Sequence, residues 1–202
     1  MFLDLLLIMP GPLRTKAVTI IAILSSISAV LMFFDFPLPL FPSFMKMDFS
    51  DLPALLGAFS LGPMAGVAIQ LIKNLIHLMR TSTGGVGELA NFLIGSAFVF
   101  SAGLVYKYHK TRRGAIVGMF VGTIAMATVA IAANFFILIP FYTTLMPLER
   151  IIAMASRIFP AVDSLDKVVF YSILPFNLIK GAIVSLVTFF IYKKLSVIIS
   201  EY

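Results

Sequence analysis

The chain has 202 residues, of which 60% are hydrophobic and 12% charged, and its mean hydropathy is +1.06. Because a soluble domain of this size carries about twice that charged fraction, the composition excludes an ordinary soluble protein and predicts a polytopic protein of the lipid bilayer. The net charge of +6 comes without a basic patch of interleaved aromatic residues, which excludes a nucleic-acid partner, and the absence of cysteine excludes disulfides and thiolate chemistry.

The first expected elements are a short interfacial segment and one membrane span. The opening MFLDLLLIMPGPLR lacks a positive region before its apolar residues, so we expect a segment that stops at Pro10, Gly11 and Pro12 rather than a signal peptide. Ala17–Phe34 is the first span, and the three prolines of DFPLPLFPSF end it. A polar outer loop, MKMDFSD, follows.

The next apolar stretch, Leu52–Met79, is interrupted by Gly62 and Pro63. Its first half, Asp51–Leu61, would rise only about 16 Å as a helix, which is too short to cross a bilayer alone. We therefore expect two short helices with a tight turn between them.

Three long spans complete the bundle: Leu89–Tyr108, Ala115–Ile139 and Val168–Tyr192. We expect Pro140 to end the second of them, because proline removes a helix hydrogen bond. The segment Phe141–Lys167 contains prolines and charged residues, so we expect it to lie mostly outside the bilayer. The predicted fold is an all-α integral membrane protein, a six-transmembrane-helix bundle with two short central helices and an outer lid loop.

Basic residues gather on one side of these spans: Arg14, Lys16, Lys107, Lys110, Arg112, Arg113, Lys193 and Lys194. The positive-inside rule places this side, with both termini, in the cytoplasm, so the loop MKMDFSD faces outward from the cell membrane. No repeat or linker divides the chain, so residues 1–202 are expected to form a single transmembrane domain.

A few polar residues are expected inside the membrane. Lys180 lies near the centre of the last span, and Asn177 shares its helix face three residues earlier. A charge at that depth is costly unless it meets a partner, a cavity or a ligand. Asn134, Glu88 and Asn91 lie near the outer ends of their spans, so the five side chains are expected to converge on a ligand site. The alternative is hydrogen bonding between helices.

The outer loop offers a cation, a thioether, a carboxylate and an aromatic ring, which suits a lid over a planar polar ligand: Lys46, Met47, Asp48 and Phe49. Ser50 or Asp51 is expected to cap the following helix, with Pro53 near its start. The glycines of TGGVGE indicate a second mobile outer loop.

Two further polar residues, Lys73 and His77, lie near the outer end of a short helix, where snorkelling to the interface explains them. Enzyme chemistry is disfavoured. Ser96 has no histidine base within reach, since His77 is placed outside and His109 inside, and two isolated histidines do not make a metal site.

Small residues form rows on two spans, and such rows allow close approach of helices in lipid. One row of the first span is Ala22 and Ser26, and a second is Ser25 and Ala29. The fifth helix carries the row Gly114, Gly118 and Gly122. We expect one face to pack inside the bundle and leave another for a membrane partner.

Four stretches of the chain resemble the riboflavin-specific substrate-binding (S) components of energy-coupling factor (ECF) transporters: KMDFSDLPALLGAFSLGPMAG, IKNLIHLMRTSTGGVGELANFLIG, ANFFILIPFY and PFNLIKG. The resemblance implies a high-affinity riboflavin-binding subunit of an ATP-driven vitamin importer. Its partners would be a transmembrane coupling subunit and two cytoplasmic ATPase subunits, which consume the ATP, and the chain itself would hold no cofactor.

The resemblance also implies site residues. Contacts to the isoalloxazine ring would come from Asn134, Asn177 and Lys180, and further contacts from Lys46, Met47, Asp48, Glu88 and Asn91. Two alternatives stay open. The first concerns the ligand, which is riboflavin, flavin mononucleotide (FMN) or an analogue. The second concerns energy: the chain acts either with an ATPase module or as a solitary secondary transporter, although its sequence lacks the two related halves that such carriers often have.

Overall fold

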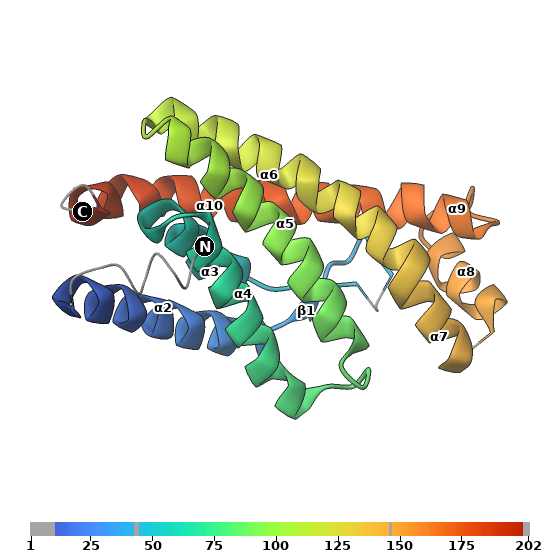
Figure 1. Cartoon of the computed structure of the whole chain (residues 1–202). Helices are drawn as coiled ribbons and strands as arrows, with labels where there is room; N and C mark the ends of the chain where they lie inside the picture. The colour runs from blue at the N-terminus through green and yellow to red at the C-terminus, as the bar shows by residue number, and fades with distance from the viewer. Residues whose placement is uncertain (1–10, 43–44, 146, 200–202) are drawn as a thin grey trace.

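The computed structural model describes residues 11–42, 45–145 and 147–199, and its helices lie side by side in a bundle with one small hairpin (Figure 1). The expected amino-terminal interfacial segment falls largely outside these residues. In the described part, four helical stretches are long and apolar enough to cross a membrane: Thr15–Met32, Val86–Tyr108, Arg112–Leu145 and Leu165–Tyr192.

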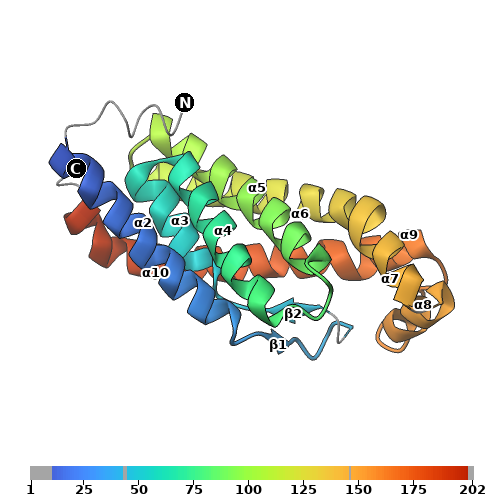
Figure 2. The same ribbon diagram turned by 60° about the horizontal axis from the view of Figure 1, so that its bottom comes forward.

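The first helix, α2 (Gly11–Met32), leads into the proline-rich segment and a two-stranded antiparallel hairpin. Strand β1 (Phe36–Pro37) pairs with β2 (Lys46–Met47), with Phe36 opposite Met47. Pro37 fits β1 because this strand is at an edge, where one side of the backbone needs no ladder partner. The hairpin lies beside the ends of α2 and α4 (Figure 2), so the predicted lid loop has a defined place.

Two short helices follow, as predicted: α3 (Asp51–Leu61) and α4 (Pro63–His77). Gly62 between them has φ +99°, a conformation that glycine adopts without strain, and Pro63 begins α4, where its missing N–H is not needed. The capping prediction is confirmed in position but not in bonding. Ser50 directly precedes α3, and Pro53 is the third residue of the helix. The Ser50 side chain makes no capping hydrogen bond, and the side chains of Ser50 and Asp51 bind Lys73 of α4 instead.

A single turn, η1 (Leu78–Arg80), connects α4 to α5 (Val86–Tyr108), and α6 (Arg112–Ala133) returns beside α5. Pro140 does not end this span, contrary to prediction. A π-helical turn, η2 (Asn134–Leu138), intervenes, and the helix continues as α7 (Ile139–Leu145). Because the π turn changes the hydrogen-bond spacing just before Pro140, the ring is accommodated without breaking the helix.

The last part of the chain has the same plan. After α8 (Leu148–Ser156), the final span runs through α9 (Leu165–Val168), a second π-helical turn, η3 (Val169–Ile173), and α10 (Leu174–Ile199). Pro175 again follows the π turn closely. The predicted outer segment is therefore partly helical, and the last span begins a turn earlier than expected.

The glycine row of α6 packs inside the bundle. A Cβ atom on Gly118 would lie 2.7 Å from the carbonyl oxygen of Ala102, and one on Gly122 equally close to that of Phe98. Helices α5 and α6 therefore touch backbone to backbone. On α2, Ser25 and Ala29 are buried, whereas Ala22 and Ser26 are exposed.

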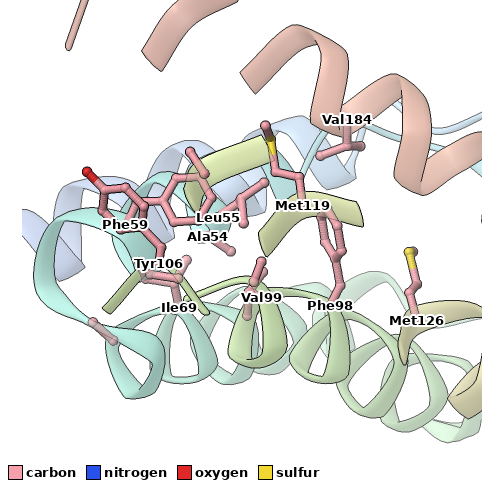
Figure 3. Packing of buried hydrophobic residues seen from close by; sticks show 14 of the residues in the cluster. Ala54, Leu55, Phe59, Ile69, Phe98, Val99, Tyr106, Met119, Met126 and Val184 are labelled. Atoms are coloured by element: carbon pink, nitrogen blue, oxygen red, sulfur yellow. The ribbon is translucent and has the colours of Figure 1, made fainter. Parts of the chain in front are cut away.

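The apolar core joins α3, α4, α5, α6 and α10. Figure 3 shows side chains from these helices interdigitating, among them Leu55, Ile69, Phe98, Met119 and Val184. A second cluster lies nearer the hairpin and α9, and includes Phe41, Met47 and Val169. The start of α2, the end of α10 and the α5–α6 connection lie at one end of the bundle, and the hairpin and α8 lie toward the other (Figures 1 and 2).

Candidate ligand-binding cavity

A cavity of about 260 Å³ opens near the hairpin end of the bundle. Its wall combines apolar side chains, among them Met126 and Phe176, with several polar groups. Six of the nine predicted site residues line it: Asn134, Asn177, Lys180, Lys46, Asp48 and Asn91. An apolar lining with a few placed polar groups is typical of small-molecule sites.

The asparagines reach the cavity from three helices. Asn134 and Asn177 are buried, and the amide nitrogen of each donates to the carbonyl oxygen four residues earlier, at 2.8 Å from Ala130 and 2.9 Å from Ile173. The amide oxygen is then the atom that can accept from a ligand. Asn91 is half-buried, and its amide oxygen has no hydrogen-bond partner among the described residues, so this atom also needs a donor from the cavity.

Lys180 does not stand alone, because its ammonium group pairs with two carboxylates. The Nζ atom lies 3.0 Å from Oδ2 of Asp48 and 3.3 Å from Oδ2 of Asp51. An ammonium has three donors, so these two contacts leave a third N–H for a ligand. The pairing explains why a lysine is tolerated at this depth.

Lys73 is the most deeply buried charged residue in the described part of the chain, at 0% exposure. Its Nζ atom lies 2.7 Å from Oδ1 of Asp51 and donates to the Ser50 hydroxyl at 2.6 Å. The prediction that Lys73 snorkels to the interface is therefore wrong. The side chain turns inward because Asp51 offers a buried counter-charge, which Gln70 also binds at 2.8 Å.

The Asp48 carboxyl lies in the loop after β2, and its other oxygen accepts from the backbone N–H of Ser50 at 2.8 Å. Burial by itself raises the pKa of Asp48, but the nearby ammonium groups of Lys180 and Lys73 outweigh burial and hold this pKa below its ordinary value. Asp48 is thus an anion that ties the loop to the floor of the cavity.

The other lid residues differ in their exposure. Lys46 lines the cavity and pairs with Asp35 at 2.8 Å, across the hairpin and partly in solvent. Met47 is 1% exposed and belongs to the second core cluster, where it anchors the hairpin. Phe49 packs against the same cluster, and its ring centroid lies 6.3 Å from that of Phe36. Met47 and Phe49 do not line the cavity.

Glu88 lies beside the cavity rather than in its wall. Its carboxylate bonds to Nδ1 of His77 at 3.0 Å and accepts from the hydroxyls of Thr81 and Thr83 at 2.9 and 3.2 Å. His77 and Thr83 do line the cavity, so Glu88 orients groups that face it. His77 is partly buried and bonded to protein, which snorkelling does not describe.

Sequence reasoning missed several residues of the site. Asp51, Gln70 and Lys73 were not expected to meet, and Tyr142 and Phe176 were not singled out as wall residues. One signal was available for Asp51. Two lysines inside the bundle require two anions, and the only acidic residues between the first span and α4 are Asp35, Asp48 and Asp51.

The fold and cavity define a helical membrane protein that encloses a polar pocket at one end of its bundle. A model of the family described as "ECF transporter, substrate-specific component" matches residues 16–192. The chain belongs to this family of S components, so it is a multi-pass membrane protein and part of a transporter rather than an enzyme.

Two proteins named as riboflavin transporters are similar to this chain over nearly its whole length. The riboflavin transporter RibU of Staphylococcus aureus is 35% identical over 183 residues, which cover 91% of this chain and 92% of that protein. The riboflavin transporter FmnP of Bacillus subtilis is 33% identical over 186 residues, covering 91% and 93%. A solved S component of a bacterial ECF transporter superposes with a TM-score of 0.72 at 34% identity, over 91% of this chain and 96% of that one. The resemblance noted in the sequence is confirmed.

Proposed function

We propose that the chain is the riboflavin-binding S component of an ATP-driven ECF importer. The observation that carries the proposal is the convergence of three buried side chains, Asn134, Asn177 and Lys180, on one cavity in a chain whose relatives are named riboflavin transporters. If these side chains served only to hydrogen-bond one helix to another, no cavity would be needed between them. A cavity is present.

The chemistry of the wall fits the pyrimidine-like edge of a flavin. That edge carries two carbonyl oxygens and an imide N–H between them. The remaining N–H of Lys180 donates to a carbonyl, and the amide oxygen of Asn177 or Asn134 accepts from the imide. Met126 and Phe176 face the apolar part of the ring, since both line the same cavity.

The hydroxyls of the ribityl chain meet the polar mouth of the cavity. Ser82, Thr83 and His77 line it there, and Lys46 comes from the hairpin. The hairpin acts as the lid, held by the Asp48–Lys180 pair. Met47 and Phe49 act as anchors of this lid, and Glu88 positions His77 and Thr83.

Six helices cross the membrane in this proposal. Besides the four long apolar stretches, the bundle contains α3 and α4, whose 11 and 15 residues rise about 16 and 22 Å and form the two short central helices. The basic residues at the end that holds the α5–α6 connection support a cytoplasmic position for that end and for both termini under the positive-inside rule, with the cavity opening outward.

Energy for uptake comes from partners, since the sequence has no Walker A motif. These are a transmembrane coupling subunit and two cytoplasmic ATPase subunits. The glycine row of α6 is occupied by α5, which leaves the exposed Ala22 and Ser26 on α2 as the small-residue face for the coupling subunit.

The test is direct. The chain is purified in detergent from cells grown with riboflavin, and the sample is examined for yellow colour and flavin fluorescence, followed by equilibrium dialysis with riboflavin, FMN and an unrelated vitamin. Tight retention of riboflavin supports the proposal. Micromolar or weaker retention contradicts it, and transport by the chain without copurifying ATPase subunits supports a solitary secondary transporter instead.

A further inference from the structure

Four buried charges form one alternating row beside the cavity. Lys73 contacts Asp51 at 2.7 Å, Asp51 contacts Lys180 at 3.3 Å, and Lys180 contacts Asp48 at 3.0 Å. The members come from four parts of the fold: α4, α3, α10 and the loop after β2. Two ammonium groups and two carboxylates leave the row with no net charge.

The members differ in their access to the cavity. Asp48, Asp51 and Lys180 line the wall, whereas Lys73 is fully buried behind it and does not. Taken alone, the three wall residues would carry one excess negative charge. Lys73 supplies the compensating positive charge from behind, through its shared contact with Asp51.

This excess charge matters for a ligand because the three charged residues are buried, at 4% exposure for Asp48, 1% for Asp51 and 4% for Lys180. A charge interacts far more strongly at a low effective dielectric than in solvent, so an unbalanced wall would repel or attract the charge of whatever docks there. A ring edge lined with carbonyl oxygens is disfavoured by a negative wall, and an anionic edge is favoured by a positive one.

We propose that Lys73 is a charge-balancing and positioning residue of the ligand site, although it touches no ligand. By compensating the charge of Asp51 it keeps the wall neutral, so that an uncharged ring edge lined with carbonyl oxygens can dock beside Lys180. The inference rests on the proposed function, because it takes the bound ring to lie against Lys180.

The reduction potential of bound riboflavin measures this balance directly. Reduction adds negative charge to the pyrimidine side of a flavin, so nearby protein charge tunes the potential. Lys73→Met leaves the wall negative, and the midpoint potential should shift to lower values. Asp51→Asn leaves it positive, and the potential should shift to higher values. The double variant Lys73→Met/Asp51→Asn restores neutrality and should return toward the parent.

Two controls separate charge from folding. Lys73→Arg keeps the positive charge and should keep the parent potential. Lys167→Met removes a lysine that pairs with Asp163 at 2.5 Å in an exposed segment, and it should shift nothing. If Lys73 had a purely structural role, Lys73→Met, Asp51→Asn and the double variant would all bind riboflavin more weakly, and the two single variants would not shift its potential in opposite directions.

The outcomes are distinct. Opposite shifts in the single variants, reversed in the double variant, support the inference. Shifts of one sign, or unchanged potentials in variants that bind riboflavin, overturn it and leave the proposed function standing, whereas a parent protein that retains no riboflavin overturns the proposed function itself. If Lys73→Met does not fold, the Asp51→Asn and double variants decide, because removing both members of a buried ion pair is tolerated better than removing one.

Discussion

Asn134 and Asn177 lie in similar local structures, each beside a π-helical turn, on two different helices. Asn134 begins one π-helical turn and Asn177 follows the other by four residues, and in each case a proline stands within two residues after the turn. Each amide nitrogen donates to the carbonyl four residues earlier. Both side chains line one cavity, and each keeps its amide oxygen available to accept from a ligand.

The asparagines should matter for binding and not for folding. Asn177→Ala and Asn134→Ala should each weaken riboflavin binding roughly ten-fold, because each removes a polar contact in a buried site. Asn74→Ala is the matched control: Asn74 makes the same bond to the carbonyl four residues earlier, at 2.8 Å, but does not line the cavity. Equilibrium dialysis measures the three dissociation constants. Equal weakening by all three changes would contradict our placement of the ring.

Lys180 should be the most sensitive wall residue. Lys180→Ala removes a ligand donor and also leaves Asp48 without its ammonium partner, so the lid loses its attachment to α10. We expect at least roughly ten-fold weaker riboflavin binding, together with faster proteolysis of the hairpin segment. Limited proteolysis of ligand-free protein checks the second effect, and a hairpin as resistant as the parent's would show that Asp48 does not hold the lid.

Acid should release the lid before it unfolds the bundle. Because the pKa of folded Asp48 lies below the ordinary value of 3.8, its pair with Lys180 stabilises the fold fully above that pH and is lost as the pH falls through the lowered value. Thermal melting of the ligand-free protein should therefore be insensitive to Asp48 between pH 7 and pH 5. Below that range the parent should lose more stability than Asp48→Asn, and parallel losses would argue against the pair.

Close packing of α5 and α6 should make Gly122 intolerant of side chains. Gly122→Val would push a side chain against the Phe98 carbonyl, and overpacking of this kind costs about 1–3 kcal/mol. Ala22→Val adds a similar side chain on the exposed face of α2 and should leave the melting temperature of the isolated protein unchanged. Circular dichroism melts in detergent compare the two variants.

The same α2 face should govern assembly rather than ligand binding. Ala22→Leu should reduce copurification of the coupling subunit, because a bulky residue prevents close approach of helices in lipid, while riboflavin affinity stays at the parent value. Pull-downs from cells that express the whole transporter measure the first quantity. Full recovery of the coupling subunit with Ala22→Leu would place its docking surface elsewhere.

The sequence by itself determined the main helical segments and the breaks after α2 and between α3 and α4. Apolar runs, the prolines after α2 and the Gly62–Pro63 turn act locally, through hydrophobicity and backbone sterics, so they can be read without knowledge of the partners. It also indicated that Asn134, Asn177 and Lys180 approach one another, since all three lie toward the same membrane face. Pro140 was misjudged because a π turn absorbs it.

Only the tertiary structure decided how the charges are shared. Lys180 and Asp48 are 132 residues apart, and Lys73 reaches Asp51 across two helices, so no local pattern specifies either pair. From its position in the sequence, Lys73 was predicted to lie at the membrane interface. In the folded bundle its side chain points inward and pairs with the buried carboxylate of Asp51. The physical reason is that a buried charge takes whichever counter-charge the assembled helices bring within reach, and that choice exists only once the bundle has formed.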